Sequence, residues 1–440
     1  MIATREAAEA VVAALRERGA EWATCAWVDV AGRPRGKLLV LDRLAEAAAA
    51  GGDLYTPRGL AWIGRSDPAE PEGYTVPDLE RAVVLPTDRR IAWIPSDVHQ
   101  DGRPFPHCTR SVLRRQVARA AQLGFRVNVG MECEVHLLRR TEDGRLEPFA
   151  AASDLRPTPL YDVRSAMDCL PVVQPMVDAM TELGWGFEAF DQECGRGQVE
   201  FDFGYTEALG MADRLTLFRH LLGEYARRAG AVACFMAKPF TDGWGSGAHV
   251  NLSLADLGSG ENLFEDARDP RGLGFSALAY AAVGGLLAHA GALTALSAPT
   301  VNSYKRLVRQ GALPDITWAP TVVAYGDNDR SCMLRLPRSR RCIENRVPDI
   351  SCNPYLALAM HVAAVLDGVE RGLDPGEPGR GGRLPRTLLE AAEALAADPL
   401  AGDVLGCDLR RDLGAAQVSE WEEHHSLVTR WELDRYLSAL

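Results

Sequence analysis

The chain has 440 residues, of which 47% are hydrophobic and 25% are charged, the composition of a globular protein long enough for two or three domains. Its net charge of −12 argues against nucleic acid as a partner, because phosphate binding needs a basic surface. The ten cysteines form no CxxC pair and no zinc-type spacing, and the N-terminal residues do not resemble a signal peptide. We therefore expect a reduced, cytoplasmic protein.

The first quarter of the chain has the pattern of a small domain that contains a sheet. Residues 4–18 are typical of an amphipathic helix, and residues 22–30 and 37–41 are typical of strands. A stretch rich in Gly, Pro and Asp follows. We place a domain boundary at the end of this stretch, which gives one domain at residues 1–105 and a second at residues 106–440.

The longest uncharged stretch covers residues 273–304, which contain no Asp, Glu, Lys or Arg. This length exceeds that of a usual membrane span. Ala and Gly dominate the stretch and His289 lies inside it, so we interpret it as a helix buried in a large protein and expect no membrane contact. Further helices are predicted at residues 111–123 and 417–440, with a Gly/Pro-rich loop at 374–385.

A long alternating segment carries acidic residues on one of its two faces. Residues two apart in a strand share a face. The sequence FRVNVGMECEVHLL at residues 125–138 therefore places Glu132, Glu134 and His136 side by side, opposite a hydrophobic face. Taken alone, such a strand is most simply an edge with one face in water.

Three shorter segments, at residues 198–203, 248–254 and 343–346, show the same alternation. Their polar faces carry, in that order, Gln198, Glu200 and Asp202; His249, Asn251 and Ser253; and Glu344 and Arg346. Glu193 precedes the first of them across a Gly-rich turn. Carboxylates this close would disfavour each other's ionisation unless cations lay between them. Oxygen ligands with a single His suit Mg²⁺ or Mn²⁺ better than zinc, so these faces predict a divalent-cation site if they meet in space.

Basic residues lie between these segments in the sequence. Residues 302–307, NSYKRL, and then Arg330 and Arg335 precede the last strand. The guanidinium group of arginine binds phosphate and carboxylate groups through paired hydrogen bonds. Enzymes that transfer phosphoryl groups use divalent ions together with arginines. Arg338 and Arg340, further along, are interpreted as part of a solvated loop.

In their order and spacing, these segments resemble the glutamine synthetase superfamily. The matching stretches are GMECE (130–134), ECGRGQVE (193–200), FMAKP (235–239), GSGAH (245–249), NSYKR (302–306), ENR (344–346) and NPY (353–355). No single motif is specific, but the combination is. TWAP at 317–320, followed by YGD at 325–327, is most similar to the γ-glutamylmethylamide synthetase and type III-like branch.

The resemblance implies an α+β fold with a small N-terminal β-grasp domain and a large catalytic domain whose curved antiparallel sheet is flanked by helices. It implies a ligase that uses ATP to activate the γ-carboxylate of glutamate as an acyl phosphate and then joins it to an amine. It also implies stacked rings, typically a dodecamer, with active sites between neighbouring subunits. Expected partners are glutamate, ATP, a small amine and two or three Mg²⁺ or Mn²⁺ ions per site.

Residue roles carried over by motif fall into three groups. The implied metal ligands are Glu134, Glu193 and Glu200 for one cation, and Glu132, His249 and Glu344 for a second. The implied ATP contacts are Asn251, Ser253, Arg330 and Arg335. The implied substrate contacts are Gly245, Arg306 and Arg346, and the implied catalytic residues are Arg306, Arg330 and Arg335.

Two acids used by ammonia-dependent relatives are missing from the corresponding positions. In the flap at residues 309–314 this chain has Ala312 where those relatives have Glu, and residues 56–60 read TPRGL where they have an Asp. Because an ammonium site needs negative charge, we predict a larger primary amine, whose alkyl part gains on the order of 0.8 kcal/mol per buried methylene. Asp315 and Asp327 are candidates for the base that deprotonates this amine.

Three smaller departures and three other functions stay open. Asn251 stands where many relatives have a second His, Asp329 stands where an Asn usually precedes Arg330, and Trp244 stands where an Asn often holds glutamate, which leaves the acid substrate open. The alternatives are a true glutamine synthetase, a catalytically silent regulatory or structural ring, and a two-metal amide hydrolase. The intact set of implied metal ligands disfavours the silent ring, and the phosphate-type arginines disfavour the hydrolase.

Overall fold

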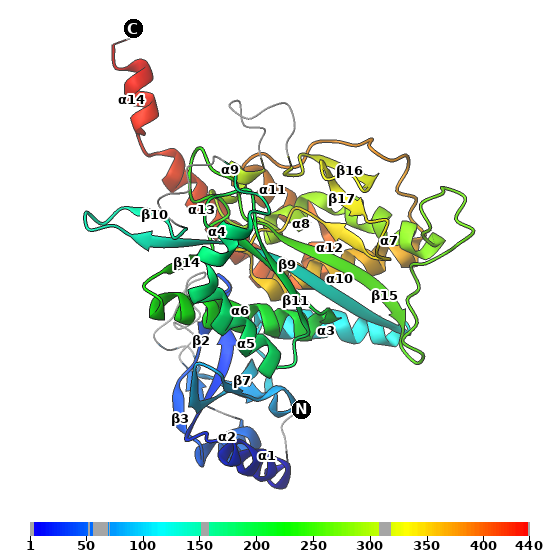
Figure 1. Ribbon diagram of the computed structural model, residues 1–440. Coiled ribbons are helices and arrows are strands. Elements are labelled where there is room, and N and C mark those ends of the chain that lie inside the picture. Colours follow the sequence, from blue (N-terminus) through cyan, green and yellow to red (C-terminus); the bar gives the residue numbers. More distant parts are fainter. Residues whose placement is uncertain are drawn as a thin grey trace.

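The computed structural model describes residues 4–51, 53–55, 69, 71–150, 158–307 and 318–438, and its strands form two sheets (Figure 1). The smaller sheet lies in the N-terminal quarter, at the bottom of the view, and the larger one runs through the rest of the chain.

The N-terminal sheet is covered by two helices. Its elements are α1 (Arg5–Glu17), α2 (Arg43–Ala50), a 3-10 helix (Leu79–Arg81), β1 (Trp22–Val28), β2 (Pro34–Arg35), β3 (Leu38–Val40), β4 (Leu54–Tyr55), β5 (Gly73–Pro77), β6 (Val83–Leu85), β7 (Asp88–Gln100) and β8 (Arg103–Pro104). The strand order is β2-β1-β7-β5-β4, with β1 and β7 parallel. Leu44 of α2 and Ile94 of β7 are fully buried in the small core between helices and sheet. Thr4 caps α1 because its side chain accepts from the backbone N–H of Ala7.

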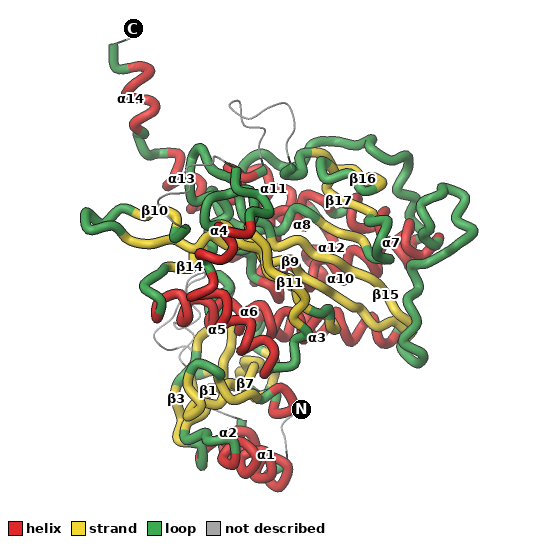
Figure 2. Tube along the Cα trace, viewed as in Figure 1, coloured by secondary structure: helices red, strands yellow, loops and turns green. Residues whose placement is uncertain are grey.

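The second sheet has a strand order of β11-β12-β9-β15-β18-β17-β16, with β10, β13 and β14 also paired to β9. Its strands are β9 (Phe125–Arg140), β10 (Leu146–Pro148), β11 (Phe187–Gln192), β12 (Gln198–Phe203), β13 (Thr206–Glu207), β14 (Val232–Cys234), β15 (Ala248–Asp256), β16 (Val322–Asp327), β17 (Cys332–Leu336) and β18 (Ile343–Asn345). Its pairs are antiparallel except β16–β17. Figure 2 shows the curvature of this sheet and the helices packed against it.

Twelve helices accompany the second sheet in the described part of the chain. They are α3 (Thr109–Gln122), α4 (Val163–Asp168), α5 (Leu170–Glu182), α6 (Ala208–Arg228), α7 (Ala277–Ala288), α8 (Ala290–Ser297), α9 (Ser303–Arg306), α10 (Pro354–Arg371), α11 (Leu388–Ala397), α12 (Pro399–Leu405), α13 (Cys407–His425) and α14 (Arg430–Tyr436). The hydrophobic face of β9 forms one core with α3, α6 and α10, which leaves its polar face free to line a cavity. The predicted α+β class is confirmed, whereas the domain boundary at residue 105 stays a prediction.

The uncharged stretch at 273–304 is buried as expected, but it forms two helices and not one. Helices α7 and α8 meet at His289 with a bend of 73°. The two ring nitrogens of His289 lie 2.8 Å from Asp398 Oδ2 and 3.1 Å from Asp367 Oδ2. The imidazole at the break between the helices thus contacts both carboxylates. Across the described ranges, no single helix is both long and apolar enough to cross a membrane.

The C-terminal prediction of one helix at 417–440 is wrong in two respects. Helix α13 already begins at Cys407 and ends at His425, and α14 is a separate helix that extends away from the body (Figure 1). The break arises because Thr429 and Glu432 form a capping box, which satisfies the free N–H groups of a new helix start.

Candidate active site

A cavity of about 820 Å³ lies over the polar face of the second sheet. Of the thirteen residues implied by the motifs, those that line it are Glu132, Glu134, Glu193, Glu200, Gly245, His249, Asn251, Ser253, Arg306, Arg330, Arg335 and Arg346. Glu344 is the exception, since it is fully buried and contacts the lining residues Arg335 and Arg346. The sequence therefore selected side chains that the fold gathers in one place.

Strand register explains why the acids meet. The central strand β9 pairs with β12 on one side, so that Glu134 lies opposite Glu200. It pairs with β15 on the other side, so that Glu132 lies opposite His249. Directly opposite residues in an antiparallel pair point to the same face, and the alternation seen in the sequence thus becomes a contiguous polar surface.

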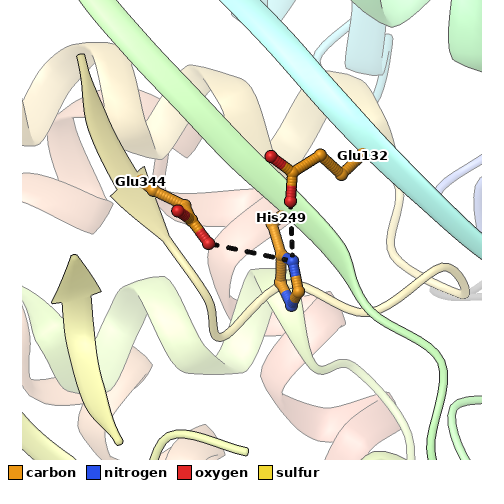
Figure 3. Close-up of side chains that lie close together, drawn as sticks. All are labelled: Glu132, His249 and Glu344. Atoms are coloured by element: carbon orange, nitrogen blue, oxygen red, sulfur yellow. Dashed lines mark hydrogen bonds and ion pairs between the residues drawn. The ribbon is translucent and has the colours of Figure 1, made fainter. Parts of the chain in front are cut away.

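Glu132, His249 and Glu344 form the first cluster (Figure 3). His249 Nδ1 lies 3.1 Å from Glu132 Oε2 and 3.9 Å from Glu344 Oε1. Asn251, which stands at the position of a second His in relatives, donates from Nδ2 to Glu132 Oε1 over 3.1 Å. The amide of Asn251 therefore orients a carboxylate of the cluster.

Glu134, Glu200 and His249 form the second cluster. His249 Nε2 lies 3.6 Å from Glu134 Oε1, so that the same imidazole separates the two clusters. Glu134 Oε2 accepts from the backbone N–H of Gly247 over 2.8 Å and from Gln198 Nε2 over 3.1 Å. Glu193 lines the same cavity but does not belong to this close group.

A third acidic group consists of Asp191, Glu200 and Asp202. Asp202 lies on the polar face identified from the sequence, whereas Asp191 was missed. Asp191 pairs with Glu200 across β11 and β12. Its spacing of two residues from Glu193 was the available signal, since residues two apart share a face of a strand.

Arginines neutralise the first cluster from two directions. Arg335 Nη1 donates to Glu344 Oε2 over 2.6 Å, and Arg346 donates to Glu344 Oε1. Arg340 Nη2 donates to Glu132 Oε1 over 3.0 Å. Arg338 and Arg340 are both exposed, as predicted for a solvated loop. Arg338 pairs with Asp327, whereas Arg340 also lines the cavity, a position that the prediction did not include.

Arg306 is held by the backbone and does not project freely into the cavity. Its guanidinium donates to Val347 O over 2.9 Å and to Arg346 O over 3.0 Å, and Nη2 lies 3.3 Å from His249 Nε2. A Cβ on Gly245 would lie 2.7 Å from Arg306 Cγ and 2.8 Å from a backbone oxygen. Only glycine allows the loop and Arg306 to pack this closely.

Arg330 and Ser253 represent two further predicted groups on the cavity wall. The guanidinium of Arg330 lies over the ring of Trp318, with Cζ 5.2 Å from the ring centroid, and the residue is exposed. Ser253 is buried on β15, two residues along the same strand face from Asn251. The cavity wall thus presents an exposed guanidinium at one place and a small polar side chain at another.

Crowding perturbs Glu193, Glu200 and Asp202, which form no ion pair with an arginine within the described ranges. Burial and the carboxylates of Glu134 and Asp191 raise the pKa of Glu193 to about 7. Burial and the neighbouring carboxylates also raise the pKa of Glu200 far above its usual range and that of Asp202 to about 6. Without a counter-charge, these groups keep protons that they would lose in water.

Glu132 behaves in the opposite way. Its burial disfavours the charged form, but the contacts with His249 and Arg340 outweigh burial and lower the pKa of Glu132. The cluster around Glu132 therefore has positive charge beside its carboxylates, whereas the cluster around Glu200 has much less. The donor set fits divalent cations, since buried carboxylate oxygens with one imidazole are hard ligands that repel one another when no cation is present.

Stability should depend jointly on pH and on divalent cations. The pKa of Glu193 is raised from 4.5 to about 7, so the cation-free folded protein binds more protons than the unfolded chain between these values. The contribution of this group to the free energy of unfolding should therefore fall as pH rises through that window.

Cations bind the charged carboxylate, so Mg²⁺ should raise Tm more at about pH 7.5 than at about pH 5.5. Thermal unfolding with Mg²⁺ or EDTA at both pH values measures this, and an equal Mg²⁺ effect at both would contradict it.

Several sequence predictions concern residues outside the described ranges. These are the flap at 309–314 with Ala312, the segment at 56–60 and the candidate base Asp315. The other candidate base, Asp327, is described, and Arg338 beside it lowers the pKa of its carboxyl. Asp327 is also not part of the cavity lining, which argues against its acting as the base.

Comparisons with known proteins agree with this geometry. A sequence profile described as "Glutamine synthetase, catalytic domain" matches residues 106–436. A glutamate–methylamine ligase of Methyloversatilis universalis is 34% identical over 438 residues, which cover 96% of this chain and 97% of that protein. A glutamine synthetase of Rhizobium leguminosarum bv. phaseoli is 33% identical over 435 residues, which cover 96% of this chain and 98% of that protein.

Two solved structures resemble the whole chain. They are described as "GmaS/ADP complex-Conformation 1" and "Apo GmaS without ligand", with TM-scores of 0.90 and 0.88. Each is 35% identical in sequence and covers 97% of this chain, which in turn covers 99% of each.

The cavity combines an acidic sheet face with arginines, and the chain matches known ligases over nearly its full length. Together these findings define an ATP-dependent ligase. This class of enzyme needs both groups, because phosphoryl transfer develops charge that cations and arginines offset. The chain belongs to the glutamine synthetase family.

Proposed function

We propose that this ligase uses ATP to convert the γ-carboxylate of glutamate into an acyl phosphate and condenses it with a primary amine other than ammonia. The observation that carries the proposal is the convergence of the carboxylates of β9 and β12 and the imidazole of β15 with arginines in one cavity. The similarity to a glutamate–methylamine ligase supports the choice of amine, as does Ala312 at a position where ammonia-dependent relatives have Glu.

Two or three Mg²⁺ or Mn²⁺ ions fit the acidic face. Glu134, Glu193 and Glu200 would hold one, and Glu132, His249 and Glu344 another. Such ions supply charge compensation for the γ-phosphoryl group. The raised pKa of Glu193 and Glu200 supports this assignment, because each carboxylate lacks the counter-charge that it needs in order to ionise.

The remaining residues would bind and orient the substrates. Arg330 and Arg335 face the cavity at the acidic clusters and would contact the phosphates of ATP, while Asn251 and Ser253 would lie along the nucleotide. Gly245, Arg306 and Arg346 would hold the amino acid. Because the donors of Arg306 already serve backbone oxygens, its part is to fix the wall against which glutamate packs.

The reaction follows from the poor electrophilicity of a carboxylate. An oxygen of the γ-carboxylate attacks the γ-phosphorus of ATP and ADP leaves. The neutral amine nitrogen then attacks the acyl carbon, phosphate leaves, and the nitrogen loses a proton. Arginines positioned before the reaction offset the charge that develops on the phosphoryl group, and a closed cavity protects the acyl phosphate from water.

We also propose a ring assembly, typically a dodecamer, in the cytoplasm. The family resemblance supports the rings, and the ten free thiols support a reducing compartment.

ADP release with Mg²⁺, ATP and glutamate across a panel of amines tests the proposed function. We expect methylamine or a larger primary amine to give the highest kcat/KM, with ammonia lower. The highest turnover with ammonia would instead indicate a glutamine synthetase. No turnover with any acid would indicate a silent ring, and amide cleavage without ATP would indicate a hydrolase.

A further inference from the structure

Among the described residues, three arginines donate to the carboxylates of the Glu132–His249–Glu344 cluster, and they differ in how firmly they are held. The side chains of Arg335 and Arg346 are 11% and 4% exposed. Arg335 also donates to Asn328 Oδ1 over 2.9 Å, and Arg346 donates to backbone oxygens. Both are therefore fixed in place by contacts beyond the cluster.

Arg340 is different, because its side chain is 49% exposed. Among the described residues, Glu132 is its one hydrogen-bond partner, reached from Nη2 to Oε1 over 3.0 Å. An exposed side chain held by a single ion pair has little to keep it in one geometry. Arg340 is thus the one arginine of this cluster that can leave its carboxylate without breaking other contacts.

The position of Arg340 conflicts with a divalent cation. Its guanidinium lies on Glu132, whose other oxygen faces His249 over 3.1 Å, so the arginine already supplies positive charge to the cluster. A divalent cation bound there would repel it. By contrast, within the described part of the chain no Lys or Arg forms an ion pair with Glu134 or Glu200 in the second cluster.

We propose that Arg340 binds nucleotide phosphate and, before nucleotide arrives, acts as the counter-ion of Glu132, so that its transfer from carboxylate to phosphate couples cation binding at the first cluster to nucleotide binding. This inference rests on the proposed ATP- and cation-dependent function. Arg340 lines the same cavity as Arg330 and Arg335, and a guanidinium released beside a bound cation finds in phosphate the anion whose geometry it matches.

Loss of the Arg340 charge should have opposite effects on cation affinity and on the coupling between cation and nucleotide. Removing the charge of Arg340 should tighten cation binding without nucleotide, because a competing cation disappears from Glu132. The same change should weaken the mutual enhancement between cation and nucleotide, because the phosphate loses a partner. By linkage, each ligand changes the affinity of the other by one common factor, so a single set of titrations measures it.

The experiment is a calorimetric titration of the full-length protein with Mn²⁺, with and without saturating ADP. Arg340→Met removes the charge, and Arg340→Lys keeps it. Arg338→Met is the matched control, since Arg338 is exposed, pairs with Asp327 and does not line the cavity. Thermal unfolding of each variant verifies that it is folded.

For Arg340→Met we expect the weaker class of Mn²⁺ sites to bind about fivefold more tightly without ADP, the scale of a half-exposed ion pair. The ratio of Mn²⁺ affinities with and without ADP should fall about tenfold, the scale of a charged hydrogen bond. Arg340→Lys and Arg338→Met should bind Mn²⁺ without ADP as the wild type does. Unchanged or weaker nucleotide-free binding by Arg340→Met would overturn this inference alone, whereas a wild type that binds no Mn²⁺ would overturn the proposed function as well.

Discussion

Glu200→Gln should lower kcat/KM by about 10²- to 10³-fold, the scale of losing a charged group that stabilises the transition state or a metal ligand. Glu200 belongs to two of the three acidic groups in the cavity. Gln keeps its shape but removes the charge on which cation binding depends. The same change should raise the Tm of the cation-free protein, because the pKa of Glu200 is raised by burial and by the repulsion of Glu134.

Steady-state kinetics and thermal unfolding with EDTA measure the two effects of Glu200→Gln together. Opposite changes in activity and stability distinguish a functional acid from a structural one. Glu147→Gln is the control, since Glu147 lies in β10, half-exposed and paired with Arg139, and should change neither quantity. Activity of Glu200→Gln within about threefold of the wild type would contradict its place in the cation site.

Arg110→Met should lower the free energy of unfolding by about 3–5 kcal/mol, because it leaves buried carboxylates without their partner. Arg110 lies on α3 with its side chain 1% exposed. It binds Asp213 of α6 through two hydrogen bonds of 2.9 Å. It also reaches Asp78 over 2.8 Å and Asp97 over 3.3 Å, both in the N-terminal sheet region.

This network joins the N-terminal sheet to the helices behind the cavity, so chemical denaturation of Arg110→Met should show a lower midpoint. Arg119→Met is the matched control on the same helix. Arg119 is more exposed and pairs with Glu370, so its loss should change stability by no more than about 0.5 kcal/mol. Equal midpoints for the two variants would show that the buried charges of the network contribute little.

The acidic face of the sheet could be predicted because strand alternation is local. The hydrophobic residues on either side of Glu132, Glu134 and His249 indicate that these three lie on the polar faces of their strands. The structure places them on one surface. The helix start near Thr4 was predictable for the same reason, since the side chain of Thr4 bonds to the backbone of the next turn. Family resemblance then supplied what alternation cannot, namely which of these residues were expected to share a cation.

Features that depend on distant partners could not be predicted. The contact of Arg340 with Glu132 spans 208 residues, and nothing near Arg340 in the sequence distinguishes it from a solvated arginine such as Arg338. His289, where the helix breaks, likewise contacts carboxylates 78 and 109 residues away. Glu344 was assigned to the cation site, but its complete burial in contact with Arg335 and Arg346 follows only from the packing of β17 and β18.

Crystals grown with ADP and Mn²⁺, measured for anomalous scattering from manganese, test most directly whether the acidic face holds cations. We expect one peak bounded by Glu134, Glu193 and Glu200 and another bounded by Glu132, His249 and Glu344. Manganese bound elsewhere, with these side chains in contact with one another and with arginines alone, would contradict the assignment on which the proposed chemistry depends.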